Sequence, residues 1–377
     1  MVINIKQEWK LYPKNMGNKL HSICSYMAMY PPTIPNYFIS NYSKIGDTVL
    51  DPFSGRGTTI LEACLLEREA LGNDRNVLAY VLSKSKASVP QKGRIISRIN
   101  NLEKNYDPLK IDISYVDKNI KMIFNNYTLK QLVYLKENLK WKMSSVDNFI
   151  ATMILGIMHG KTRGYLSLSM PNTFSMSPNY VRGYIKNHNL KKPKRDVFKL
   201  LQEKLERCYQ KSNKRGKVYM QDARNMTRIM DSTVDLIVTS PPYTRLITYG
   251  KFNWIRLWFL GKEGAKIDKK LFVTQSLDKY CDFMKDVLTE FKRVLKPSGR
   301  AVIVIGDVKK KGSDEIINLA ENVWERCARP LGFNQVGDII DDLIYNEEIG
   351  NPKVSRIWGD TKGEATKIDR ILVLSRV

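Results

Sequence analysis

The sequence predicts an α/β protein built on an open sheet and carrying a basic, mainly helical insert. Three observations lead to this fold class. Two strand-like runs each end in a turn rich in glycine or proline, apolar strand-length runs alternate with helical patterns, and positive charge is concentrated in a central segment. At 377 residues, 43% of them hydrophobic, the chain is long enough for one large α/β domain plus an inserted module.

The first turn is Asp51-Pro52-Phe53-Ser54-Gly55-Arg56-Gly57-Thr58-Thr59, between an apolar run at 48–50 and a helical pattern from Ile60. A strand, a Gly-x-Gly turn and a helix form the opening unit of nucleotide-binding α/β folds, in which glycines let the backbone approach a ligand closely. Asp74 lies 17 residues after Gly57 and follows a second short strand at 70–72. That spacing places Asp74 to accept hydrogen bonds from ribose hydroxyls. A helix-capping role for Asp74 is the alternative.

The second turn is Thr239-Ser240-Pro241-Pro242-Tyr243, which follows an apolar strand run at 234–238. Proline has no N–H for a sheet ladder, so the strand must stop at this turn. A stiff, exposed turn is therefore expected at the carboxyl end of a strand, where open α/β sheets bind ligands. We expect the two turns to meet in space.

Together these turns resemble motif I and motif IV of the amino-group DNA methyltransferases, which use S-adenosylmethionine. The resemblance implies a Rossmann-like, seven-stranded methyltransferase sheet with an antiparallel last pair of strands, and a catalytic domain formed by residues 1–83 and 218–377. Ser-Pro-Pro-Tyr is similar to the N4-cytosine branch, whereas N6-adenine enzymes more often carry Asp in place of the serine. N6-adenine methylation, RNA amino-group methylation and non-catalytic nucleic-acid binding stay open as alternatives.

The resemblance also implies the residues around S-adenosylmethionine. A segment similar to motif X covers 21–39 and, in the family, packs beside motif I; an ordinary N-terminal helix is the alternative. Asp222 follows a short strand at 217–220 and matches the family's acidic partner of the adenine amino group. In the commoner plan the recognition region follows the third strand, whereas here it falls between the second and third. The expected cofactor residues are Tyr26, Asp51, Phe53, Ser54, Gly55, Gly57, Thr58, Asp74, Asp222 and Ala223.

The second turn carries the expected catalytic residues, Ser240, Pro241, Pro242 and Tyr243. An exocyclic base amine is a poor nucleophile because its lone pair is delocalised into the ring. Ser240 Oγ and the Pro241 carbonyl are expected to accept its two hydrogens and direct the lone pair at the sulfonium methyl. Tyr243 is placed to stack on a base that has left the duplex. None of the five cysteines follows a proline, which argues against cysteine-dependent carbon-5 methylation.

The central segment, residues 84–217, holds 28 Lys and Arg against 9 Asp and Glu, and so carries +19 of the net charge of +24. Such a concentration indicates a polyanion-binding module, because phosphate neutralisation supplies most non-specific nucleic-acid affinity. Helical apolar patterns around a polar loop favour a folded DNA-recognition subdomain; a helical cover with a solvated basic face is the alternative. The expected DNA-binding residues are Lys191, Lys192, Lys194, Arg195, Asn172 and Arg245.

The rest of the chain completes the sheet. An aromatic stretch at 249–261 either borders a nucleotide channel or packs as a helix. An amphipathic helix at 280–295 and an apolar strand at 301–305 follow, and Phe333 to Ile340 and Ile371 to Leu374 are expected to form the last two strands.

The remaining composition bears on location and partners. The chain opens without a signal-peptide pattern, and five cysteines without Cys-x-x-Cys argue against a disulfide framework or a zinc site. The most apolar helical run, 149–158, is about half the roughly 20 residues that span a membrane. We expect a soluble, cytoplasmic protein that needs no metal and whose partner is double-stranded DNA. The resemblance implies a prokaryotic, nucleoid-associated protein that a cognate restriction endonuclease can accompany; the oligomeric state is open.

Overall fold

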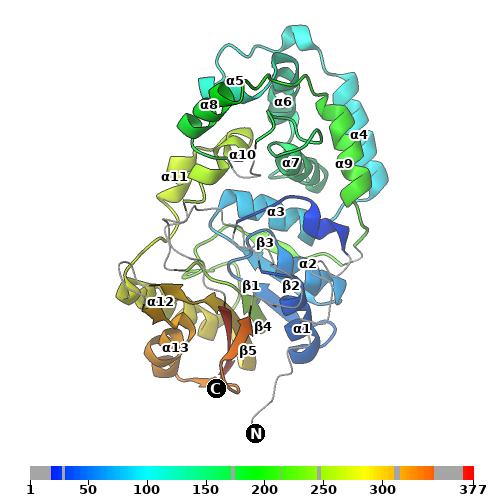
Figure 1. Cartoon of the computed structure of the whole chain (residues 1–377). Helices are drawn as coiled ribbons and strands as arrows, with labels where there is room; N and C mark the ends of the chain where they lie inside the picture. Colours follow the sequence, from blue (N-terminus) through cyan, green and yellow to red (C-terminus); the bar gives the residue numbers. More distant parts are fainter. Residues whose placement is uncertain are drawn as a thin grey trace.

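The computed structural model describes residues 18–27, 30–170, 175–212, 214–243, 248–309, 315–343 and 368–377. Figure 1 shows two parts: a twisted sheet with flanking helices and, above it, a lobe made of helices. Among the described residues no helix is long and apolar enough to cross a membrane.

The sheet is mostly parallel, and its order is β3-β2-β1-β4-β5-β10-β8, with β9 also paired to β10. The first five strands of this order run parallel, and β10 runs antiparallel to β5, β8 and β9. This arrangement confirms the predicted fold class. The strands are β1 (Thr48–Asp51), β2 (Glu69–Asn73), β3 (Lys217–Tyr219), β4 (Val234–Thr239), β5 (Leu295–Gly306), β8 (Phe333–Gln335), β9 (Ile340–Leu343) and β10 (Ile368–Arg376); β6 (Val308–Lys309) and β7 (Ile316–Ile317) form a separate small pair.

The expected strand from Phe333 to Ile340 is interrupted. Gly337 adopts φ +73°, a left-handed conformation that an extended strand cannot contain, and the run divides into β8 and β9. Residues 369–375 of β10 pair with β5, while β9 pairs with 368–371 and β8 with 374–376. Since one edge of β10 is occupied by β5, β8 and β9 lie end to end along the other edge as one broken strand.

Alternate strand residues point to opposite faces of the sheet, and each face is covered by its own helices. Leu50, Ile237 and Ile303 pack into a core with the long amphipathic helix α12 (Leu277–Val294) and α13 (Leu319–Val323). Their neighbours Val49, Leu236 and Val302 pack on the other face. The helices there are α1 (Thr33–Tyr42) and α2 (Thr58–Leu65), while α3 (Val77–Ala87) connects the sheet to the lobe.

The lobe is built around α7 (Ser145–Ile157), the apolar helix considered above for a membrane. Its side chains are buried against α3 and its neighbours in the lobe, so it is a core helix. The other lobe helices are α4 (Lys92–Lys104), α5 (Lys118–Ile123), α6 (Asn126–Asn138), α8 (Pro178–Asn187) and α9 (Val197–Cys208).

Two short helices that follow the second turn also belong to the lobe: α10 (Trp254–Phe259) and α11 (Gly264–Asp268). Ile255, Leu257 and Phe259 are buried in the same core as α6 and α7, so the aromatic stretch serves mainly as helical packing. The helical lobe therefore draws on residues beyond 84–217, and α3 runs across residue 84. The expected domain boundaries stay a prediction.

The insert between α3 and β3 leaves the sheet domain and returns to it at one place, whereas α10 and α11 enter the lobe separately after β4. The Gly216 N–H donates to the Ala87 carbonyl at 2.7 Å, so the end of α3 and the start of β3 are joined directly. At Gly216 a Cβ would lie 2.6 Å from the Ala70 carbonyl oxygen, and this close approach requires glycine. The two ends of the insert are thus adjacent in space at the edge of the sheet domain.

A buried arginine, Arg256, ties the lobe to the N-terminal segment. Its guanidinium donates to the Leu155 carbonyl at 3.1 Å, to the Ser25 carbonyl and hydroxyl at 2.9 Å each, and to Asn253 Oδ1 at 3.1 Å. The fork of donors joins α10, the end of α7 and the residue before Tyr26. Tyr26 is thereby held at the boundary between the lobe and the sheet.

Candidate active site

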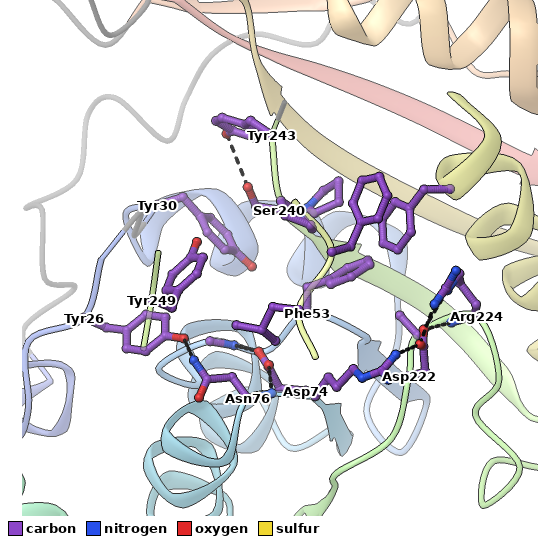
Figure 2. A pocket seen from close by; sticks show the side chains of 18 of the residues that line it. Tyr26, Tyr30, Phe53, Asp74, Asn76, Asp222, Arg224, Ser240, Tyr243 and Tyr249 are labelled. Carbon is purple, nitrogen blue, oxygen red and sulfur yellow. Dashed lines mark hydrogen bonds and ion pairs between the residues drawn. The ribbon is translucent and has the colours of Figure 1, made fainter. Parts of the chain in front are cut away.

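A cavity of about 240 Å³ lies at the carboxyl ends of the central strands, where both turns meet. The glycine turn follows β1, Asp74 follows β2, Asp222 follows β3, and the Ser240 turn follows β4. Figure 2 shows these side chains converging from different elements. The cavity is lined by Tyr26, Tyr30, Phe53, Gly55, Asp74, Arg75, Asn76, Asp222, Ala223, Arg224, Ser240, Pro241, Pro242, Tyr243, Tyr249, Leu271, Phe272, Phe283 and Asp369.

The expected catalytic residues all border this cavity, but the expected cofactor residues divide into two groups. Six of them line it: Tyr26, Phe53, Gly55, Asp74, Asp222 and Ala223. The other four are buried behind the wall: Asp51, Ser54, Gly57 and Thr58.

The glycine turn needs left-handed backbone at two positions, Gly55 (φ +49°) and Gly57 (φ +77°). Ser83 of α3 holds the turn, because its hydroxyl lies 3.0 Å from both Ser54 Oγ and the Gly55 carbonyl oxygen. A Cβ on Gly57 would lie 2.8 Å from Ser83 Cα, which leaves no room for another residue. The turn is therefore set by helix packing as well as by its own sequence.

The buried residue Asp51 links the two turns by hydrogen bonds. Its Oδ1 accepts hydrogen bonds from Thr239 Oγ1 at 2.7 Å and from the Phe53 N–H at 3.2 Å. Burial raises the pKa of Asp51 to about 6, and these hydrogen bonds oppose the rise. Asp51 therefore joins the ends of β1 and β4.

Asp74 faces the cavity and organises its floor. Its carboxylate accepts hydrogen bonds from the Gly55 N–H at 2.9 Å and the Asn76 N–H at 2.8 Å. Burial raises the pKa of Asp74 to about 7. Asn76, rather than Asp74, is the N-cap residue of α3, because the Asn76 side chain accepts a hydrogen bond from the Leu78 N–H.

The N-terminal segment packs beside the glycine turn, as the resemblance to motif X implies. Arg56 donates to the His21 carbonyl at 3.0 Å, and His21 Nε2 lies 2.6 Å from Glu62 Oε1 of α2. Tyr26 accepts a hydrogen bond from Asn76 Nδ2 at 3.0 Å and stacks on Tyr249, with 5.8 Å between ring centroids.

Asp222 lies at the expected place, but its carboxylate is already saturated. Oδ1 accepts hydrogen bonds from the backbone N–H and from Nε of Arg224, at 3.0 Å each. Oδ2 accepts a hydrogen bond from Arg224 Nη2 at 2.9 Å and forms an ion pair with Arg75. Burial pushes the pKa of Asp222 up, but the bonds from Arg224 and the charge of Arg75 outweigh it and the net shift is downward. A carboxylate offers about four acceptor sites, so Asp222 can take an adenine amino hydrogen only by releasing an arginine bond.

Aromatic rings form the wall beside Asp222. Phe272 stacks flat on Phe283, with 4.0 Å between centroids, and Phe53 approaches Phe283 at 6.1 Å. The Arg224 guanidinium lies 5.5 Å from the Phe283 centroid. This wall suits a flat heteroaromatic ring.

The Ser240 turn holds a short chain of polar contacts. Ser240 Oγ lies 3.3 Å from the Tyr243 hydroxyl, which donates to Asp369 Oδ1 at 3.3 Å. Burial raises the pKa of Tyr243 well above its usual range, so the phenol stays protonated. Beside Ser240 in Figure 2, Tyr30 is hydrogen-bonded to Thr59 of α2.

Several lining residues were missed from the sequence. Tyr30 lies within the segment similar to motif X and Tyr249 begins the aromatic stretch, so both were near a recognised signal. Asp369 comes from β10, 126 residues after Tyr243, and only strand pairing brings it to the site. No local pattern marks it.

The expected DNA-binding residues lie elsewhere. Lys191, Lys192, Lys194 and Arg195 occupy the connection between α8 and α9, which crosses the upper part of the lobe in Figure 1, away from the sheet. The three lysines are partly or fully exposed; Lys192 Nζ donates to the Lys121 carbonyl at 3.0 Å, and Lys194 Nζ lies 4.7 Å from the Tyr127 ring centroid. Asn172 and Arg245 lie outside the described residues.

The described ranges show no grouping of side chains suited to a metal ion or a disulfide. No three His, Cys, Asp or Glu side chains gather there as a ligand set. All five cysteines are free and buried.

Comparison with known proteins identifies the family. A family model described as DNA methylase, for N6 and N4 amino groups, matches residues 3–85 and 234–356, which is more than half of the chain. The chain belongs to this amino-group DNA methyltransferase family. The family predicted from the two turns is therefore confirmed, whereas the choice between its cytosine and adenine branches stays a prediction.

The curated relatives are type II methyltransferases. The family member M.MvaI from Kocuria varians is 23% identical over 287 residues, covering 69% of this chain and 61% of that protein. M.MjaI from Methanocaldococcus jannaschii is 40% identical over 65 residues, covering 17% and 22%. The chain thus spans about three fifths of one relative and under a quarter of the other.

Solved structures that match the chain include TrmN from Thermus thermophilus, with a TM-score of 0.39 and 12% identity, covering 96% of this chain and 53% of that one. Another is a putative DNA modification methylase, also from Thermus thermophilus, complexed with S-adenosyl-L-methionine, with a TM-score of 0.25 and 24% identity, covering 41% and 50%.

Proposed function

We propose that this chain is a DNA methyltransferase that transfers a methyl group from S-adenosylmethionine to the exocyclic N4 amine of an extruded cytosine, as the modification enzyme of a restriction–modification system. The observation that carries the proposal is that the glycine turn and the Ser240-Pro-Pro-Tyr243 turn border one cavity. The family membership supports a DNA substrate.

The cavity fits S-adenosylmethionine. Gly55 presents backbone without a Cβ to it, Asp74 offers carboxylate oxygens at the end of β2, and the Phe272–Phe283 stack offers a flat apolar surface. We assign Asp74 to the ribose hydroxyls and the aromatic wall to the adenine ring. The bound cofactor would supply a methyl group on a sulfonium, an electrophile that needs no metal.

The residues of the Ser240 turn would prepare the nucleophile. Ser240 Oγ and the Pro241 carbonyl accept the two amine hydrogens, which turns the nitrogen lone pair toward the methyl group. In the displacement a nitrogen–carbon bond would form as the sulfur–carbon bond breaks, and the sulfur would keep the bonding electron pair. The methylated nitrogen then loses one proton to solvent, so no strong base is required.

The test is the chemical identity of the product. DNA incubated with the protein and S-adenosylmethionine, then digested to nucleosides, should contain N4-methylcytosine by mass spectrometry. N6-methyladenine alone would overturn the cytosine assignment and leave the adenine branch. Methylated RNA without methylated DNA, or no methylated base, would overturn the proposal.

An exposed basic surface supports DNA binding by the lobe. Residues 178–195, here called the α8 surface, contain six Lys and Arg and no Asp or Glu. Along the exposed helix α8, Tyr184 stacks on Tyr180 at 6.1 Å and on His188 at 4.0 Å between ring centroids. Val181 is the only fully buried residue of α8. A stacked aromatic row flanked by cations suits a nucleic-acid partner.

We predict that DNA affinity falls steeply with salt. A plot of log affinity against log salt concentration has a negative slope, to which each phosphate contact contributes about 0.9. Replacing Lys191, Lys192, Lys194 and Arg195 together by glutamine should make this slope less steep by about 3 to 4 units. The slope is measured by fluorescence anisotropy with duplex DNA across a salt series, and calorimetry should show unchanged cofactor affinity.

A charge-matched variant serves as the control for the salt slope. Lys44, Arg228, Lys279 and Lys285 lie on the surface of the sheet domain, so their fourfold replacement by glutamine removes the same charge elsewhere. Equal slopes for the two variants would show that net charge, rather than the α8 surface, governs binding.

We also predict a pH dependence of cofactor affinity. Asp74 has a pKa raised to about 7, and ribose hydroxyls donate to its ionised form. Affinity should therefore rise with pH, by about tenfold per unit below pH 7, and level off above pH 8. Calorimetry of S-adenosylmethionine from pH 5.5 to 8.5 measures this, and Asp74→Asn should bind weakly at every pH without the rise. A flat wild-type profile would contradict the assignment of Asp74.

A further inference from the structure

Asp369 enters the active site from β10, and nothing in the two motif turns specifies it. It pairs with Gly306, the last residue of β5, in the antiparallel ladder, which places its carboxylate at the same sheet edge as Ser240. Asp369 Oδ1 accepts the Tyr243 hydroxyl at 3.3 Å, and the Tyr243 oxygen lies 3.3 Å from Ser240 Oγ. Figure 2 shows the Tyr243–Ser240 contact at the cavity wall.

The number of hydrogens available determines which atom donates in each of these two hydrogen bonds. A phenol has one hydrogen, and an ionised carboxylate can only accept. Once the Tyr243 hydrogen goes to Asp369, the hydrogen between Ser240 and Tyr243 must come from Ser240. The Ser240 lone pairs are then left to face the cavity.

The neighbouring residue Arg370 faces the other side of the strand. Alternate residues of a strand face opposite sides, and Arg370 makes two bonds of 2.8 Å to the buried carboxylate of Asp307. Asp369, on the opposite side of the strand, accepts the Tyr243 hydroxyl.

We propose that Asp369 is a positioning residue which, through Tyr243, holds the Ser240 hydroxyl as a hydrogen-bond acceptor for the target amine. This inference rests on the proposed function. Without Asp369, Tyr243 is able to donate to Ser240, and the Ser240 hydrogen then turns toward the amine hydrogens that Ser240 must accept. The Asp369 carboxylate thus keeps the Ser240 hydrogen from pointing at the hydrogens of the target amine.

The experiment compares steady-state kinetics of DNA methylation in wild type, Asp369→Ala, Asp369→Asn and Tyr243→Phe. Asp369→Ala should lower kcat about ten- to hundredfold, the range for loss of one hydrogen bond to a charged group. KM for DNA and cofactor Kd should change less than twofold. Asp369→Asn keeps an acceptor oxygen and should restore much of kcat, and Tyr243→Phe should lower kcat as Asp369→Ala does.

A double-mutant cycle separates positioning from a general structural effect. In a Ser240→Ala background, adding Asp369→Ala should lower kcat no further, because the hydroxyl whose direction it sets is gone. Thermal unfolding checks that each variant folds, and Tyr243→Phe, which removes only one oxygen, supplies the same test if Asp369→Ala does not.

The outcomes are distinguishable from failure of the proposed function. An active wild type with an unchanged kcat in Asp369→Ala, or with full additivity in the cycle, overturns the positioning role alone. A wild type that methylates no DNA overturns the proposed function, and this inference with it.

Discussion

Ser240→Ala should lower kcat for DNA methylation by roughly two orders of magnitude while cofactor and DNA affinities stay within about twofold. Ser240 Oγ borders the cavity and would accept a hydrogen from the target amine as that nitrogen becomes pyramidal. The contact strengthens in the transition state, so its loss appears in kcat rather than in binding.

Single-turnover methyl transfer with a tritiated cofactor measures this effect directly. Ser169 is exposed on the lobe and lies outside the cavity lining, so Ser169→Ala is a suitable control that should keep the wild-type rate. If Ser240→Ala methylates at the wild-type rate, the Ser240 hydroxyl has no part in the reaction and the cytosine assignment loses its basis.

Gly55→Val should abolish detectable cofactor binding while the protein still folds. Gly55 has φ +49°, which a β-branched residue adopts only with strain, and it lines the cavity beside the Tyr26 ring. A Cβ there would sit at ordinary contact distance, 3.6 Å from Tyr26, so the branched methyl groups would occupy cavity space. Calorimetry with S-adenosylmethionine should show at least a hundredfold loss.

Two further glycine variants separate cofactor binding from stability. Gly57→Ala should lower the free energy of unfolding by about 3 kcal/mol, since its Cβ meets Ser83 and its φ is +77°. Gly183 lies in α8 with open space around it, so Gly183→Ala should leave both cofactor affinity and stability near or above wild type. Unchanged cofactor affinity in Gly55→Val would remove the cofactor from this cavity.

The sequence was informative where the decisive residues are neighbours in the chain. The two turns were found because each combines a strand end with residues of special backbone behaviour, and parallel strands bring their carboxyl ends together. Side-chain direction was not visible at that level. Asp51 and Asp74 both lie at strand ends, yet Asp51 bonds to Thr239 while Asp74 lines the cavity.

Features that depend on residues far apart in the chain could not be predicted from the sequence. The saturation of Asp222 depends on Arg75, 147 positions earlier, and the placement of Asp369 depends on strand pairing with β5. Gly337 was not recognised as the break between β8 and β9, because a glycine in an apolar run fits a strand equally well until its φ is known. The sequence also could not show that α10 belongs to the lobe, because its apolar pattern does not indicate which core its buried face packs against.

With the proposed role of the insert in DNA recognition, the hydrogen bond between Ala87 and Gly216 has a consequence for how target specificity could be exchanged. Because the insert departs and returns at points adjacent in space, a different insert can be joined there without altering the register of any strand of the sheet. The buried face of α10 sets the compatibility condition, since a donor module must match Ile255, Leu257 and Phe259. Chimeras that carry residues 248–271 along with the insert should therefore exchange target sequences, and those that carry the insert alone should expose an apolar seam and aggregate.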